Sequence, residues 1–508
     1  MTSFLPNHPP DRALQAKFGP AIIWILLVLS GIVLRVHLLL KYPDLWFDSD
    51  EANLGLMALH LLRDGKFHIF IAGESYGGCL GVAVISLFTL LTGSPFLGIK
   101  LAPLLFFVLF AASLFALGRQ LFNTAVGLIA VALVSFSSAF LTAMGVRERG
   151  PHPETLFLGT LLMWLTCRLS GREVNSGLAW AGWGALVGFA WYTHYISIFY
   201  IAPCVLFLLL NKKLLAWRPL LWAPGGFLAG SLLYWVFVFR YFDLPPFGSA
   251  GLKFFDPWIG LKNFLLVGFP ILAGTRWSFH QVDLVPVFSK LVVFIYGGAL
   301  LFFFFRIVRD RVSLRNGKVL LAMVIVSCPP IFAFSSFAWF AAEPRYLMSL
   351  CVGLSLVLAW FVWELWRQSK LLAATAMILV TGVSVYGSVT VPAEVFNTIF
   401  AEPNTAVIRF AREKGLKHFY ANYWIVYRLM FETQEELVGA NYFDITRERY
   451  PKFKQRVDQD PNPSYIAWES EAPGFQEKLQ KSGRHYQHER IGRYVVFYNV
   501  RPRLPPPP

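Results

Sequence analysis

The sequence contains about eleven apolar runs, and most of them are long enough to cross a lipid bilayer as a helix. Of the 508 residues, 56% are hydrophobic and only 15% are charged, whereas about 25% of the residues of a soluble domain are charged. A single buried core cannot hide so much apolar surface. We therefore predict a polytopic α-helical membrane protein. The expected spans are residues 20–40, 97–117, 124–143, 155–170, 177–193, 195–210, 219–239, 288–306, 319–338, 346–366 and 371–390.

The charged residues between these spans predict the orientation of the chain, because Lys and Arg are enriched in cytoplasmic loops. With a cytoplasmic N-terminus, short basic loops face the cytoplasm and longer, acid-bearing loops face outward. The net charge of +15 follows from this asymmetry, so nucleic acid is not expected as a partner. The basic residues on the cytoplasmic side are Arg119, Arg168, Arg172, Lys212, Lys213, Arg218, Arg306, Arg309, Arg311, Arg315, Lys318, Arg367 and Lys370.

The composition changes after residue 390, where no further spanning run occurs. We expect a membrane domain over 1–390, with outer loops at 41–96 and 240–287, and an outer α/β domain over 391–508. The proline-rich tail, Pro505 to Pro508, is expected to be disordered. The helix-like pieces of the second domain are 404–414, 423–431 and 472–482, and its strand-like pieces are 417–421, 464–468 and 493–500.

The first outer loop carries the most unusual cluster of charges, three carboxylates within four residues: Asp48, Asp50 and Glu51. Apolar residues at helical spacing follow them, which predicts an amphipathic helix along the membrane surface. Helix capping explains one or two acids at such a position. Capping does not explain a triplet, so we favour the hypothesis that Asp48, Asp50 or Glu51 is catalytic. Capping and catalysis are compatible.

A second cluster lies between the third and fourth spans: Arg147, Glu148, Arg149, His152 and Glu154. An exposed ion-pair loop is one interpretation, and such pairs contribute little energy. The alternative is a site for a phosphate and a divalent metal ion, Mg²⁺ or Mn²⁺, held by the acids and the histidine. Both interpretations stay open on the residues alone.

A third cluster opens the tenth span with Glu343, Pro344, Arg345 and Tyr346. Arg345 either reaches toward the lipid head-groups or binds a phosphate, which suits its planar guanidinium. Two further candidates for substrate binding are Tyr76, in the first outer loop, and His194, between the fifth and sixth spans. A lone histidine among aromatic residues is more often structural than a ligand.

Several ordered motifs together resemble a known superfamily. These are the acidic pair DE at 50–51, the segments GESYGGCLGVAVISLFTLLTGSPFLGIKLAPLLF at 73–106 and GALVGFAWYTH at 184–194, PRYLMSL at 344–350 and HFYANYWIVYRLMFETQE at 418–435. With this topology they resemble the GT-C membrane glycosyltransferases. The nearest likeness is to the protein O-mannosyltransferase-like family, which includes the lipid A aminoarabinose transferases, in a bacterial branch. The resemblance covers nearly the whole chain.

The resemblance implies a hexosyl- or pentosyltransferase that moves a sugar, with inversion, from a polyprenyl-phosphate carrier to a hydroxyl of a lipid, glycan or protein. It implies a multi-pass protein of the bacterial inner membrane, surrounded by membrane lipid, with a periplasmic C-terminal domain. Asp50 matches the family's first-loop catalytic acid and Glu51 its neighbour, whereas Asp48 has no counterpart. Glu148 or Glu154 takes the place of a second-loop acid that binds metal in some relatives.

Two rival functions follow from the same composition. One is a transporter or flippase for a lipid-linked substrate, which would carry ionisable groups near the bilayer midplane. In this chain the acids gather at one membrane face instead. The other is a scaffold whose outer domain binds a partner, which leaves the acidic first loop unexplained.

Overall fold

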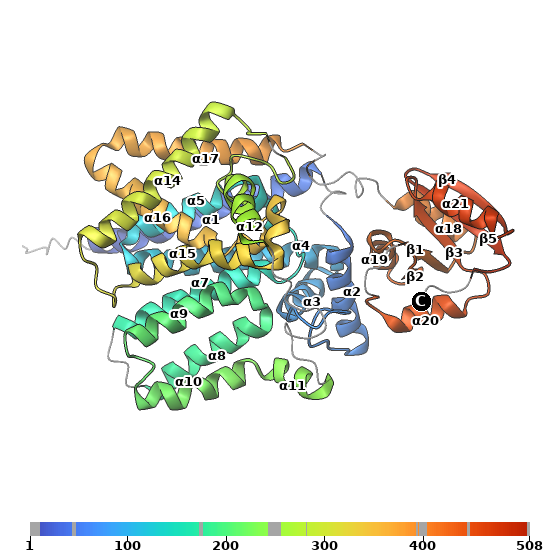
Figure 1. Ribbon diagram of the computed structural model, residues 1–508, viewed down its shortest axis with the longest axis horizontal. Helices are drawn as coiled ribbons and strands as arrows, with labels where there is room; N and C mark the ends of the chain where they lie inside the picture. Colours follow the sequence, from blue (N-terminus) through green and yellow to red (C-terminus); the bar gives the residue numbers. More distant parts are fainter. Residues whose placement is uncertain are drawn as a thin grey trace, which may run out of the picture.

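The computed structural model describes residues 11–42, 47–171, 176–241, 256–280, 282–392, 395, 404–443 and 448–504. Figure 1 shows a body of helices with an α/β unit attached at one end. The tail 505–508 and residues 242–255 of the expected second loop lie outside the described residues.

Within the described part of the chain, six helices are long and apolar enough to cross a membrane, and a bent pair makes a seventh candidate span. The expected count of about eleven is therefore not confirmed. The run at 124–143 divides at Phe136 into two short helices, and the run at 219–239 bends by 64° between its two halves. The six are α1 (Asp11–Lys41), α4 (Pro95–Leu121), α14 (Pro286–Arg309), α15 (Gly317–Phe334), α16 (Leu350–Gln368) and α17 (Lys370–Thr390), and the bent pair is α10 (Trp217–Gly230) with α11 (Leu232–Tyr241).

The other described helices complete the body. They are α2 (Ser49–Asp64), α3 (Leu80–Thr92), α5 (Thr124–Ser135), α6 (Ala139–Met144), α7 (His152–Gly171), α8 (Gly177–Thr193), η1 (Tyr195–Ser197), α9 (Ile198–Leu210), α12 (Pro257–Asn263), η2 (Phe264–Gly268), α13 (Phe269–Leu272), η3 (Ser336–Ala342) and η4 (Arg345–Leu347).

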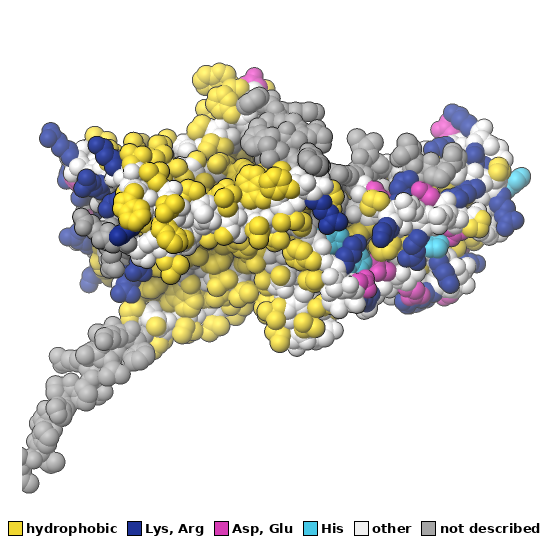
Figure 2. All heavy atoms as spheres, turned by 90° about the horizontal axis from the view of Figure 1, so that it is seen from below, with side chains coloured by type: hydrophobic (Ala, Val, Ile, Leu, Met, Phe, Trp, Pro, Cys, Tyr) yellow, Lys and Arg dark blue, Asp and Glu magenta, His cyan; other side chains and the backbone are white. Residues whose placement is uncertain are grey.

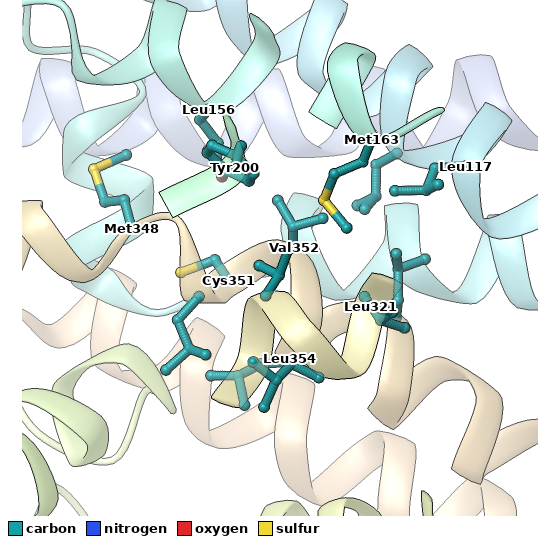
Figure 3. Close-up of a cluster of buried hydrophobic side chains, with 14 of the residues drawn as sticks. Leu117, Leu156, Met163, Tyr200, Leu321, Met348, Cys351, Val352 and Leu354 are labelled. Carbon is teal, nitrogen blue, oxygen red and sulfur yellow. The ribbon is translucent and has the colours of Figure 1, made fainter. Parts of the chain in front are cut away.

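Interlocking apolar side chains from α4, α7, α9, α15 and α16 fill the centre of the body (Figure 3). Within it, Tyr200 is fully buried and donates a hydrogen bond to the carbonyl oxygen of Ser349, just before α16. This bond satisfies the phenol's polar atom, as a buried tyrosine requires. The packing fixes the N-terminal end of α16, which directly follows the η4 turn that carries Arg345 and Tyr346.

Arg35 is buried in α1 and bridges it to α5. Its guanidinium donates to the carbonyl oxygens of Val134 and Ser135, and lies over the ring of Phe107. The last carbonyls of a helix lack partners inside it, so Arg35 satisfies the groups left free where α5 ends. A charge buried in a span therefore has a structural use here.

The helix predicted after the acidic triplet exists as α2, and other parts of the protein cover its apolar residues. Residues 51–60 of α2 are all buried, because α3 and α4 cover one side and a helix of the C-terminal unit covers another. The apolar spacing was therefore recognised correctly, whereas its burial partner was not.

The C-terminal unit is a five-stranded sheet of order β2-β1-β3-β5-β4 with helices packed against it. The predicted strands and helices match β1 (His418–Ala421), β3 (Ser464–Trp468), β5 (Tyr494–Arg501), α18 (Thr405–Glu413), α19 (Tyr423–Glu432) and α21 (Ala472–Lys481). Sequence patterns missed the short β2 (Val438–Asn441), the polar edge strand β4 (His485–Ile491) and α20 (Pro451–Gln459). β1 pairs in parallel with β2 and β3, and β5 pairs antiparallel with β3 and β4.

Candidate active site

Asp48 caps the N-terminus of α2 from a fully buried position. Its Oδ1 accepts hydrogen bonds from the backbone N–H groups of Asp50 and Glu51. Its Oδ2 lies 2.5 Å from Arg147 Nη2 and 2.8 Å from Arg149 Nε. Burial opposes ionisation, but Arg149 and Arg147 outweigh it and lower the pKa of Asp48 to about 2. Asp48 is therefore ionised, and both of its carboxylate oxygens already have hydrogen-bond or ion-pair partners.

Glu51 is also fully buried, and it pairs with a lysine from a membrane helix. Its Oε1 lies 2.5 Å from Lys100 Nζ on α4, and its Oε2 lies 3.5 Å from Arg147 Nε. Each of these charges has a partner of opposite sign, which a buried charge requires. Glu51 and Asp48 thus bind α2 to α4 and to the segment before α7.

Asp50 differs from its two neighbours because its side chain is 25% exposed. It faces a cavity of about 260 Å³, which we call the main cavity. Its Oδ1 accepts a hydrogen bond of 2.8 Å from the hydroxyl of Tyr423, and its Oδ2 lies 3.8 Å from Arg149 Nε. The acidic triplet is therefore divided into a cap, a buried ion pair and one open carboxylate. The other lining residues are Asn53, Leu54, Ile71, Glu74, Tyr76, Arg149, Gly150, Pro151, His152, His194, Arg345, Tyr346, Tyr423, Trp424 and Arg449.

Arg345 lines the main cavity without a carboxylate partner among the described residues. Its guanidinium lies 4.8 Å from the ring centre of Phe340 and 5.4 Å from that of Tyr346. Tyr346 hydrogen-bonds to Arg345 and stacks on Phe337. These rings hold the guanidinium in place while its positive charge stays uncompensated.

His152 and His194 lie side by side at the same cavity, with ring centres 5.4 Å apart. Burial and then the positive charge of Arg345 lower the pKa of His194 to about 3, and burial also lowers the pKa of His152. The Nδ1 of His194 accepts the N–H of Ile196, so the neutral ring carries its proton on Nε2. Tyr76 packs against His194, and together these rings form an uncharged aromatic wall.

A second cavity of about 160 Å³ adjoins the main one at Arg149, which lines both. Arg149 forms an ion pair with Glu343 as well as with Asp48. Arg147 lines this second cavity and not the main one. Asp48, Glu343 and Ser278 also line this cavity, and its other walls are apolar and include Trp277 and Phe279.

Residues 78–238 match a family model described as dolichyl-phosphate-mannose-protein mannosyltransferase. Over 94% of its length the chain is similar in structure to ArnT from Cupriavidus metallidurans bound to undecaprenyl phosphate, with a TM-score of 0.59, 12% identity and 98% of that chain covered. The chain has the fold of the GT-C glycosyltransferases. The resemblance drawn from the sequence motifs is thereby confirmed.

Two archaeal structures share this GT-C fold. One is AglB from Archaeoglobus fulgidus in complex with an inhibitory peptide and a dolichol-phosphate, with a TM-score of 0.53, 10% identity, and coverage of 97% of this chain and 75% of that one. The other is the A. fulgidus oligosaccharyltransferase in complex with Zn and sulfate, with a TM-score of 0.54, 12% identity, and coverage of 94% and 73%. No curated protein matches the chain in sequence.

The chain does not bring its three expected metal ligands together. His152 faces the main cavity, whereas Glu148 and Glu154 are buried against the backbone of α3. A Cβ on Gly81 would lie 2.8 Å from Glu148 and 2.5 Å from Glu154, so the two carboxylates meet there. Across the described ranges, no three His, Cys, Asp or Glu side chains are placed to hold a metal ion. These residues therefore do not fit the expected metal site.

Glu148 and Glu154 instead form a carboxyl pair. Their carboxyl oxygens approach each other at Gly81 in a buried position, where the charged form of each group is disfavoured. Burial, together with Glu154, raises the pKa of Glu148, and burial raises the pKa of Glu154 to about 7. The pair is therefore kept from full ionisation at neutral pH.

Tyr423, Trp424 and Arg449 also line the main cavity, and sequence reasoning did not select them. They belong to the C-terminal unit, more than 370 positions beyond Asp50 in the chain. Their only sequence signal is that Tyr423 and Trp424 fall within the family-like segment 418–435. Glu74 and Lys100 were missed as well: both fall within the family-like segment 73–106, but neither belongs to a cluster of charges.

We expect Glu154→Gln to change the pH dependence of stability. With a folded-state pKa of about 7, Glu154 binds a proton more tightly in the folded chain than in the unfolded one, where its pKa is about 4.3. Stability therefore falls as the pH rises between these values, and the loss is complete above pH 7. The glutamine variant lacks this loss, so its melting temperature should exceed that of wild type at pH 8, by roughly 1–3 °C, and match it near pH 5.

The measurement is thermal unfolding in detergent from pH 5 to pH 8. Glu477→Gln is the control, because Glu477 lies on α21 with a side chain that is 63% exposed. If the curves for wild type and Glu154→Gln run parallel, burial does not raise the pKa of Glu154 in the folded chain.

Proposed function

We propose that this chain is an inverting membrane glycosyltransferase. It transfers a hexosyl or pentosyl group from a polyprenyl-phosphate-linked donor to a hydroxyl of a lipid, glycan or protein. The observation that carries the proposal is a single cavity that holds one open carboxylate, Asp50, and one guanidinium without a carboxylate partner among the described residues, Arg345. Two structural relatives have been solved with polyprenyl-phosphate-type ligands, ArnT with undecaprenyl phosphate and AglB with a dolichol-phosphate.

Asp50 suits the role of general base. Displacement at the anomeric carbon forms a bond from the acceptor oxygen to C1 and breaks the bond from C1 to the phosphate oxygen. The acceptor's proton must leave during this step, and a carboxylate within hydrogen-bond reach can take it. Asp48 and Glu51 are fully buried and held by cations, so neither can reach an acceptor.

Arg345 is placed to stabilise the leaving group, the polyprenyl phosphate. The departing polyprenyl phosphate gains negative charge, and a guanidinium fixed beforehand stabilises that charge without reorganising. The aromatic contacts described above fix Arg345 in this way. Arg149 and Arg449 line the same cavity, but each is already paired with a carboxylate.

The uncharged aromatic wall of the main cavity can bind the sugar of the donor. Tyr76, His152 and His194 present phenol and imidazole groups that can exchange hydrogen bonds with sugar hydroxyls and offer ring faces for packing. His194 Nε2 supplies a donor, because its Nδ1 is occupied by Ile196.

The proposed location is the inner membrane of a bacterium, with residues 1–390 in the membrane and 391–508 in the periplasm. Figure 2 shows Lys and Arg gathered at the end of the helical body that lies away from the C-terminal unit, and an apolar surface between. Basic ends face the cytoplasm. This distribution supports an orientation with the main cavity on the periplasmic side.

Asp50→Asn should abolish transfer while the protein still folds. Loss of a catalytic base typically slows the reaction by about 10²- to 10⁴-fold. The assay offers purified protein a panel of polyprenyl-phosphate sugars with candidate acceptors and measures released polyprenyl phosphate. Asp64→Asn, an exposed aspartate on the same helix, should retain activity. Near-normal turnover by Asp50→Asn would remove Asp50 from the mechanism.

Arg345→Lys should raise the KM for the lipid donor or lower kcat by roughly tenfold or more, because lysine keeps the charge and loses the two-pronged contact with phosphate. A merely lipid-facing arginine would tolerate lysine. Arg367→Lys, with a side chain that is 65% exposed, is the matched control. Superimposable donor titrations for Arg345→Lys and wild type would contradict a phosphate-binding role.

A cysteine at Lys481 should react in intact cells with a thiol reagent that cannot cross the inner membrane. Lys481 is 76% exposed on the C-terminal unit, and the five native cysteines are all buried, so background labelling should be low. A cysteine at Arg309, which is 60% exposed at the basic end, should react only after lysis. The reverse pattern would invert the proposed orientation.

A further inference from the structure

The C-terminal unit contacts the candidate active site directly. Its helix α19 packs on α2, and one continuous apolar cluster joins Leu54 and Met57 of α2 to Ile425 and Phe431 of α19. A Cβ on Gly55 would lie 2.4 Å from the ring of Phe431, so the two helices meet with no room for a larger side chain. The first turn of α19 is thereby held against the first turn of α2.

Tyr423 makes the polar contacts at this junction. The hydroxyl of Ser49 donates a hydrogen bond of 2.8 Å to the carbonyl oxygen of Tyr423, and the hydroxyl of Tyr423 donates one of 2.8 Å to Asp50 Oδ1. Backbone and side chain of Tyr423 are therefore both tied to the start of α2.

Arg449 completes the arrangement from the loop before α20. Its Nη2 donates to the hydroxyl of Tyr423 at 3.3 Å, and its guanidinium forms an ion pair with Glu74 of the first loop. The hydroxyl of Tyr423 thus accepts a hydrogen bond from Arg449 and donates one to Asp50. Because a hydroxyl has one proton, it can donate only to Asp50 in this arrangement. Burial and then Asp50 raise the pKa of Tyr423, so this proton stays in place at physiological pH.

We propose that the C-terminal unit completes the active site, and that Tyr423 is a positioning residue that fixes the carboxylate of Asp50. The inference rests on the proposed function of Asp50 as base. The bond from Tyr423 occupies Oδ1 and sets the plane of the carboxylate, which leaves Oδ2 to take the acceptor's proton. Tyr423 keeps its own proton throughout and does not touch the reacting atoms. A misplaced catalytic group can slow a reaction by up to about 10²-fold.

The test compares Tyr423→Phe with wild type in the release of polyprenyl phosphate. Only the hydroxyl is removed, so kcat should fall about tenfold while the KM for the donor changes less than twofold. The acidic limb of the kcat profile should also move to higher pH, because a carboxylate that loses a hydrogen-bond donor is protonated more easily. A purely structural role would leave this limb in place.

Tyr420→Phe is the matched control. Tyr420 is a buried tyrosine of the same unit, and its hydroxyl donates to Asp458 rather than to the cavity. Its kinetics and pH profile should match those of wild type. Arg449→Lys is a second variant, which keeps the charge for Glu74 and weakens the contact with Tyr423. It should lower kcat in the same direction and still serves if Tyr423→Phe fails to fold.

The outcomes separate this inference from the proposed function. If wild type releases no polyprenyl phosphate from any donor, the proposed function fails. If wild type is active and Asp50→Asn is not, but Tyr423→Phe keeps the wild-type kcat and pH profile, only the positioning role is overturned. An equal loss in Tyr420→Phe would also overturn it, because the effect would then belong to the whole C-terminal unit.

Discussion

The structure of the site depends on a network of buried charges at the start of α2. Asp48 and Glu51 are fully buried, and Arg147 and Lys100 are almost so. Removing one partner of a buried ion pair leaves an uncompensated charge, at a cost of about 3–5 kcal/mol. These four residues must therefore keep their relative positions, and they come from α2, α4 and the segment before α7. The network fixes where α2 begins and which way its first turn faces.

Because of this constraint, residues of the same type have different roles. The carboxylates of Asp48 and Glu51 form the ion pairs of the network, whereas Asp50 stays open to the main cavity. The arginines divide in the same way: Arg147 and Arg149 pair with acids, whereas Arg345 lies against aromatic rings. Whether a charged side chain is available to a substrate depends on the partner it is paired with. The residue type alone does not decide this.

The sequence predicted much of this arrangement, because the strongest signals were local. The length of the apolar runs predicted the long helices, and the density of acids at 48–51 indicated the candidate site. Prediction from the sequence failed where a contact depends on residues that are far apart in the chain. The buried face of α2, the hydroxyl of Tyr423 on Asp50 and the meeting of Glu148 with Glu154 all depend on tertiary packing. The count of about eleven spans is not confirmed, because a break such as Phe136 divides a helix while it leaves the hydropathy of the run unchanged.

The most direct test is a structure of the protein with undecaprenyl phosphate, determined in lipid nanodiscs. If an uncompensated Arg345 and an open Asp50 face one donor site, the phosphate should lie in the main cavity, within hydrogen-bond distance of the Arg345 guanidinium. Asp50 should then face it across the space for the sugar. Phosphate bound in the second cavity, or beyond the reach of Arg345, would contradict this arrangement.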